Sequence, residues 1–288
     1  FCFDLLLVGL LIIVTRVGCI LHEAGGHALV AYLLGAKIRS LEVTLFAGGS
    51  VDFRFPVAQP WCEFWSIAAG MLLNFVSGVV ALLFVRRCES RPVLGPLLAM
   101  FGAISILLPL AYLAIGLYYG VGDPESLLQH VTSGRVPWDR LVLSLPFLAL
   151  TPWVSYLAVR PYCRIQQARF PSATYRGRLA IGALTLGVAS IVYLGLYALS
   201  QRLSPQHLAV FDAPQMADHA ARVRLQSAHW FPMIPAVALF YLLGAALGQL
   251  RGAKAAAAAP LSWRATVGTC IVAFAIIAAI YATAQRFI

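Results

Sequence analysis

The chain has 288 residues, of which 61% are hydrophobic and 11% charged, and its mean hydropathy is +0.83. A soluble domain carries about 25% charged residues, so this composition excludes soluble globular, disordered, collagen-like and coiled-coil classes. The formal charge of +10 does not indicate a nucleic-acid partner, because the basic residues lie in short connections between apolar runs, where they set topology and contact anionic headgroups. We therefore expect an integral membrane protein that contacts the lipid bilayer, and its arginine-rich composition favours a bacterial inner membrane.

The apolar runs are long enough to cross a bilayer, whose core of about 30 Å requires roughly 20 apolar residues per helix. The first run extends from Leu5 to about Ala36 and is interrupted by ionisable residues. Six further runs contain no acidic or basic residue: Phe64–Val85, Val93–Tyr119, Leu141–Val159, Leu179–Ser200, Trp230–Leu250 and Ala265–Gln285. The sequence thus predicts an all-α polytopic membrane protein with about seven transmembrane helices.

The connection between the first two spans is long enough to fold. Residues 40–55 read as two short strands, because Val51–Phe55 alternates between apolar and polar side chains, and Gly48-Gly49 favours a turn. The predicted organisation has two parts, namely a three-helix core with this β-region in residues 1–127 and four additional spans with a polar loop at 203–229 in residues 128–288.

The basic residues give the expected orientation. The connections on one side of the membrane contain eleven Lys and Arg residues, and those on the other side contain nine. The first group comprises the connections near residues 86–91, 160–178 and 251–264. Because cytoplasmic connections are richer in Lys and Arg, this count favours the first side as the cytoplasmic one.

Three ionisable residues lie close together in the first span. His22, Glu23 and His27 occur within six residues, although each ionisable group inside a span costs about 2.5–3.5 kcal/mol on insertion scales. Two imidazoles and a carboxylate suggest a zinc hydrolase, with the histidines as metal ligands and Glu23 as general base towards a metal-bound water. The alternative is an interhelical polar network or ion path. Arg16 either balances charge inside the bundle or extends to the interface.

The spacing of the two histidines predicts a distorted helix. In the usual H-E-x-x-H motif the histidines are four residues apart, whereas His22 and His27 are five apart, which places them about 140° apart around a regular α-helix. A π-bulge would return both to one face. Gly25-Gly26 lies where the distortion is needed, and glycine tolerates it best. The spacing resembles the zinc motif of the dipeptidyl peptidase III family.

Asp123 is the preferred third ligand because of its position. The first and third spans run in the same direction, and Asp123 lies just past the third span, on the side reached by His27. Gly120, Gly122 and Pro124 break the helix there and let the carboxylate turn inward. The alternative is an ordinary helix-ending turn at the interface. Four other histidines lie in connections, namely His130, His207, His219 and His229.

Small and polar residues recur every four positions along the second span, at Ser66, Gly70, Asn74 and Gly78. Such a stripe allows close approach of a neighbouring helix, and an asparagine within it can hydrogen-bond across the interface. The stripe therefore either packs helices or brings Asn74 to a catalytic centre or a bound peptide carbonyl.

These motifs occur in an order that resembles the site-2 protease family of intramembrane zinc proteases. The matching residues, within roughly residues 5–127, are His22-Glu23-x-x-x-His27, Gly48-Gly49, Gly70-Met-Leu-Leu-Asn74 and Asp123. The resemblance implies that His22, His27 and Asp123 bind Zn²⁺ and that Glu23 is the general base. It further implies that Asn74 stabilises the reaction centre or substrate, with the matched glycines in supporting positions, and that the site is placed towards the cytosol.

Three functions are consistent with this pattern. The first is an intramembrane zinc endopeptidase that cleaves transmembrane segments of a membrane protein or peptide substrate. The second is a catalytically inactive relative that acts as a membrane scaffold or regulator. The third is a transporter with a polar intramembrane pathway. Metal content separates the first two from the third, and peptide turnover separates the first from the second.

Overall fold

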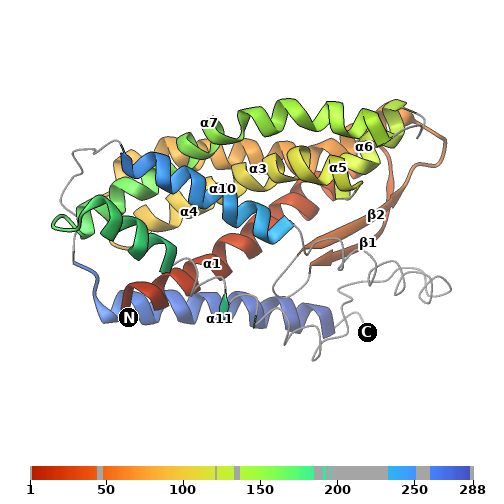
Figure 1. Ribbon diagram of the computed structural model, residues 1–288. Helices are drawn as coiled ribbons and strands as arrows, with labels where there is room; N and C mark the ends of the chain where they lie inside the picture. The colour runs from red at the N-terminus through yellow and green to blue at the C-terminus, as the bar shows by residue number, and fades with distance from the viewer. Residues whose placement is uncertain are drawn as a thin grey trace.

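Long apolar helices form most of the molecule (Figure 1). The computed structural model describes residues 2–43, 48–120, 122–132, 137–184, 191–192, 195, 233–250 and 260–285. Within these residues, five helices are long and apolar enough to cross a membrane: Phe3–Leu33, Pro60–Cys88, Leu94–Tyr119, Arg140–Arg169 and Trp263–Ile280. The predicted mostly helical fold with membrane-length helices is therefore confirmed.

Two of the seven predicted spans are not among these five helices. The run Trp230–Leu250 is represented by helix α10 (Met233–Leu250), whose apolar stretch Ala236–Gln249 is shorter than the other five. The run Leu179–Ser200 lies largely outside the described residues, and so does the polar loop at 203–229. The number of seven spans stays a prediction.

The first span is a continuous rod of three helical segments, which are α1 (Cys2–Ile20), the π-helix η1 (Leu21–Ala28) and α2 (Leu29–Leu33). Leu6, Leu7 and Leu10 of α1 are fully buried in the main apolar core. Arg16 lies on the same helix and is only 2% exposed. Its side chain is therefore enclosed by protein inside the bundle, and the interpretation that it extends to the interface is wrong.

The predicted β-region is an antiparallel hairpin of β1 (Lys37–Val43) and β2 (Gly49–Arg54). It begins three residues before the predicted segment at residue 40. The sequence predicted Gly49 in the turn. In the structure it is instead the first residue of β2 and pairs with Val43. The absence of a side chain at Gly49 serves packing instead, because an added Cβ atom would lie 2.5 Å from the carbonyl oxygen of Glu42 and 2.6 Å from Cγ of Glu23.

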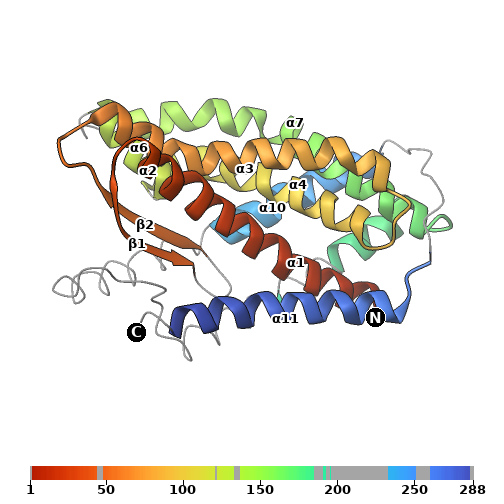
Figure 2. The same ribbon diagram turned by 180° about the vertical axis from the view of Figure 1, so that it is seen from behind.

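The helices after the hairpin are α3 (Pro60–Cys88), α4 (Leu94–Ala111), the π-helix η2 (Tyr112–Gly116), α5 (Leu117–Tyr119), α6 (Gly122–Thr132), α7 (Pro137–Arg169), α10 and α11 (Trp263–Gln285). Helix α4 is central and packs against α1, α3, α7 and α10. Its Ala99, Ala103 and Leu107 are fully buried. Helix α11 lies along α1 at the edge of the bundle, as both views show (Figures 1 and 2).

Helix α7 is longer than the apolar pattern predicted. The span was expected to end at Val159 and to be followed by a connection, but the helix continues to Arg169. The arginines end the apolar run without ending the helix, because two of them bind neighbouring segments. Arg164 forms an ion pair with Glu89, and Arg169 donates a hydrogen bond to the carbonyl of Pro92 at 2.8 Å.

Candidate metal centre

The helix that carries the two histidines is distorted, as the sequence predicted. Residues Leu21–Ala28 form the π-helix η1, whose hydrogen bonds run between residues five apart. His22 and His27 therefore lie on one face, with their Nε2 atoms 3.0 Å apart. Both side chains are buried. The extra residue between them, compared with H-E-x-x-H, is accommodated by the wider helical turn.

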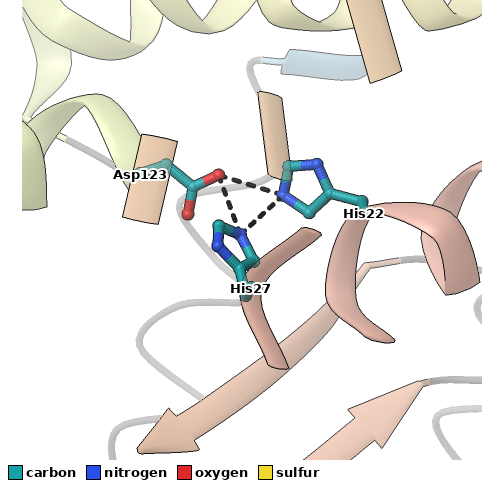
Figure 3. Close-up of side chains that lie close together, drawn as sticks. All are labelled: His22, His27 and Asp123. Atoms are coloured by element: carbon teal, nitrogen blue, oxygen red, sulfur yellow. Dashed lines mark hydrogen bonds and ion pairs between the residues drawn. The ribbon is translucent and has the colours of Figure 1, made fainter. Parts of the chain in front are cut away.

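Asp123 reaches the same point from the start of α6 (Figure 3). Its Oδ2 atom lies 3.0 Å from Nε2 of His22 and 3.4 Å from Nε2 of His27. Gly120 and Gly122 have φ values of +67° and +69°, a left-handed conformation that favours glycine. These two glycines turn the chain after α5, and the turn directs Asp123 towards the histidines.

The three donor atoms form a group that can hold a metal ion, since they all lie within 4.8 Å of one another. An ion with bonds of about 2.0–2.2 Å holds its donors about 3.3–3.6 Å apart in a tetrahedron and about 2.8–3.1 Å apart in an octahedron. The observed separations of 3.0, 3.0 and 3.4 Å fit one face of either arrangement.

The hydrogen bond of His27 fixes the direction of its free lone pair. Nδ1 of His27 lies 2.9 Å from the backbone carbonyl of Ser66 on α3. A carbonyl oxygen only accepts hydrogen bonds, so Nδ1 of His27 is the donor, and the lone pair of a neutral ring is on Nε2, directed at the centre. Metal-binding histidines usually have such a partner on the second ring nitrogen.

Asn74 supports His22 in the same way. Its amide Nδ2 lies 3.1 Å from Nδ1 of His22, and its buried Oδ1 has no hydrogen-bond partner among the described residues. A half-turn of the amide places Oδ1 opposite Nδ1, where it accepts the proton of His22 and gains the missing partner. Both histidines then direct unprotonated Nε2 atoms at the carboxylate of Asp123, an arrangement that a cation stabilises.

The charge of Asp123 suits this arrangement. Burial alone would raise the pKa of its carboxyl group. When no cation is bound, a proton on Nε2 of His22 or His27 is donated to the carboxylate, and this interaction outweighs the effect of burial and holds the pKa below its usual range. The Asp123 side chain is therefore an anion at neutral pH and can neutralise part of the charge of a bound metal ion.

Two glycines make room for the histidines. A Cβ atom at Gly70 would overlap the imidazole of His27 and lie 2.9 Å from Cε1 of His22. A Cβ atom at Gly26 would lie 2.5 Å from Cα of Gly70. The backbones of η1 and α3 are therefore in direct contact, which is the close approach that the stripe on the second span predicted.

Glu23 lies beside the hairpin, on the same π-helix as the two histidines. It is 6% exposed, and a Cβ atom at Gly49 would lie 2.6 Å from its Cγ atom. Strand β2 thus covers one side of the predicted general base. A second buried carboxylate, Glu42 of β1, accepts a hydrogen bond from the hydroxyl of Ser50 at 3.3 Å. Gly48 directly precedes β2.

The sequence did not indicate two contacts of this centre. The carbonyl of Ser66 binds His27, but a backbone group leaves no signal in the sequence. The ring of Tyr112 packs against Gly122, beside Asp123, and a Cβ atom there would lie 2.7 Å from its Cε1. Helix η2, which begins at Tyr112, was not predicted either. The alternative histidine ligands fall outside the described side chains, namely His130, His207, His219 and His229.

In comparisons with protein-family models, curated proteins and solved structures, nothing matches the chain. The fold and the site define it as a mostly helical protein with membrane-length helices and a His₂Asp group that can hold a metal ion.

Proposed function

We propose that this protein is an intramembrane zinc endopeptidase that cleaves transmembrane segments of other membrane proteins. The observation that carries the proposal is the convergence of His22, His27 and Asp123 among membrane-length helices, with Glu23 in the same π-helix. Three protein ligands leave one position of a four-coordinate zinc for water, which is the ligand count of catalytic sites. Non-haem iron sites use the same three ligand types, and we favour zinc because a glutamate adjoins the first histidine.

In the proposed peptide hydrolysis, the metal ligands and Glu23 have separate roles. His22, His27 and Asp123 would hold the zinc ion, which when bound lowers the pKa of a water to about 7 and polarises the scissile carbonyl. Glu23 accepts the proton of the attacking water and passes it to the leaving amide nitrogen. Its burial against β2 keeps bulk water away from the carboxylate during this transfer.

A transmembrane substrate must unwind before cleavage, because peptide groups in a helix are hydrogen-bonded and shielded. The β1–β2 hairpin supports this step in our proposal, since both strands contact η1 and a strand edge can pair with an extended peptide. The predicted substrate is thus a helix with a locally unstable segment. Gly49, which directly follows Gly48, is the hairpin residue at which an added Cβ atom would lie 2.6 Å from Cγ of Glu23.

The sharpest test compares Glu23→Gln with the wild-type protein. The amide cannot accept a proton, so we expect unchanged zinc content and thermal stability but a loss of turnover of about 10²–10⁴-fold. Cleavage of a membrane-embedded peptide with a helix-destabilised segment is the activity assay. Glu63→Gln, a matched substitution at the start of α3 and outside the ligand group, should keep full activity.

Metal analysis of the purified protein tests the ligand set. We expect one zinc per chain, lost in His22→Ala, His27→Ala and Asp123→Ala. Full zinc occupancy in Asp123→Ala with loss in the histidine variants would remove Asp123 from the ligand set. Zinc-loaded wild type without turnover on any such peptide would favour the scaffold or regulator function. A metal-free wild type would favour the polar pathway of a transporter.

A further inference from the structure

The two ends of the helix bundle differ in charge. In Figure 1 the hairpin and α6 lie at one end, and the N-terminus and the start of α11 lie at the other. Among the described residues, this second end carries nine arginines and two acidic residues. The arginines are Arg86, Arg87, Arg91, Arg160, Arg164, Arg169, Arg176, Arg178 and Arg264, and the acidic residues are Asp4 and Glu89. We refer to it as the arginine-rich end.

Among the described residues, the metal end has no such excess of cations. The part of the chain that the structure describes contributes four basic residues there, namely Lys37, Arg39, Arg54 and Arg140. It contributes six acidic residues, namely Glu23, Glu42, Asp52, Glu63, Asp123 and Glu125. Two of the four cations form ion pairs, Arg39 with Asp52 at 3.8 Å and Arg140 with Glu125 at 2.6 Å.

Three arginines of the arginine-rich end hold the fold together. Arg164 pairs with Glu89, Arg169 donates to the carbonyl of Pro92, and Arg178 donates to Oε1 of Gln249 at 3.0 Å. The other six are exposed: Arg86, Arg87, Arg91, Arg160, Arg176 and Arg264. They come from several segments, namely the end of α3, the connection before α4, the last third of α7, the segment after α7 and the start of α11.

Two of the exposed arginines lie along apolar side chains. The guanidinium carbon of Arg87 is 5.4 Å from the centre of the Phe84 ring, and that of Arg160 is 5.7 Å from the centre of the Tyr156 ring. Phe84 itself is 48% exposed on the outer face of α3. A long side chain that follows an apolar surface and ends in a charge suits the boundary between acyl chains and headgroups.

We propose that the arginine-rich end binds anionic phospholipid headgroups of the cytoplasmic leaflet, and that the metal centre lies towards the opposite side of the membrane. Lys and Arg residues next to spans are retained on the cytoplasmic side, and over the whole sequence the connections on the arginine-rich side contain eleven of them against nine on the other side. Acidic residues contribute little to orientation. The proposal holds whether or not the centre is catalytic.

Cysteine labelling tests the sidedness. In the full chain with its native cysteines replaced, Gln59→Cys reports on the metal end and Ser90→Cys on the arginine-rich end, and both positions are exposed. In bacterial spheroplasts, a membrane-impermeant maleimide should label Gln59→Cys directly and Ser90→Cys only after lysis. The reverse pattern, or equal labelling of both in intact spheroplasts, would overturn the orientation. Labelling in detergent confirms that both thiols are reactive.

Lipid titration tests the headgroup surface. The purified full chain in neutral detergent should gain thermal stability with phosphatidylglycerol and little with phosphatidylcholine or inorganic phosphate. Replacing Arg86, Arg87 and Arg91 with Gln should remove most of this shift, whereas replacing Lys37 and Arg54 with Gln should not. Equal shifts in both variants, or an equal effect of phosphate, would overturn the lipid assignment. Neither experiment depends on peptide cleavage, so a failure here is distinguishable from a failure of the proposed function.

Discussion

At the scale of single residues, Asn74 acts on the centre through His22. Its amide contacts Nδ1 of His22 rather than the space in front of the three donor atoms. We expect Asn74→Leu to keep the fold and to weaken metal affinity about 10–100-fold, the usual cost of losing the partner of a ligating histidine. Competition with a chelator of known affinity measures this change.

A neighbouring serine provides the control for Asn74. The hydroxyl of Ser77 donates to the carbonyl of Asn74 at 3.0 Å, and no hydrogen bond among the described residues joins it to His22 or His27. Ser77→Ala should therefore leave metal affinity unchanged. Equal affinity in Asn74→Leu and wild type would show that His22 is oriented by other contacts.

Gly70 provides a second prediction at this scale. A methyl group there would overlap the imidazole of His27, so Gly70→Ala should displace the ring and abolish stoichiometric metal binding, with an overpacking cost of about 1–3 kcal/mol. Gly78→Ala is the matched control on the same helix, because its Cβ atom would lie 2.9 Å from Ile106, far from the ligands. It should lower thermal stability and keep the metal. A metal-loaded Gly70→Ala protein would contradict the structure.

At the scale of elements, the π-helix η1 is the feature that follows most directly from the sequence. Two ligands five residues apart cannot share a metal on a regular α-helix, and Gly25-Gly26 shows where the backbone deforms. Helix η2 could not be predicted, since no pair of ligands with that spacing marks residues 112–116. The end of α7 was misplaced for a different reason, because hydropathy reports the end of an apolar run and not that of a helix.

Removing one glycine from η1 should be tolerated. Deletion of Gly25 restores the four-residue spacing, and a π-bulge is one extra residue in an α-helix whose flanks otherwise keep their register. We expect the deletion variant to fold and to bind metal. Deletion of Gly18 from the regular helix α1 is the control, because it rotates His22 by about 100° relative to the preceding turns and should abolish metal binding. A folded Gly25 deletion without metal would show that the five-residue spacing is required.

At the scale of the whole molecule, the candidate metal centre joins segments that are distant in sequence. His22 and His27 belong to the first span, Asp123 follows the third, and the partners of the histidines belong to the second. The sequence indicated the two histidines because ionisable residues in a span are rare, and it indicated Asp123 because that residue follows a span parallel to the first. It did not indicate which spans pack against one another, since apolar side chains of similar size can pack against any of several helices.

Metal removal should therefore loosen the bundle as a whole. A ligand present at 100 times its dissociation constant stabilises the folded state by about 2.7 kcal/mol. We expect a chelator to lower the midpoint of thermal unfolding of the wild-type protein and to leave that of His27→Ala unchanged. Tryptophan fluorescence during heating measures both. An identical response of the two proteins would show that the chelator acts elsewhere.

The contacts of Gly26, Gly49 and Gly70 limit how this region tolerates change. At each position an added Cβ atom would meet the backbone or a side chain of the centre at 2.6 Å or less. Substitution at these glycines would thus be as damaging as substitution of a ligand, although none of them takes part in the chemistry. A mutational scan that measures function would show both the three glycines and the ligand residues as intolerant of substitution. Measuring the metal content of the variants that still fold would distinguish a steric clash in the backbone from the loss of a ligand.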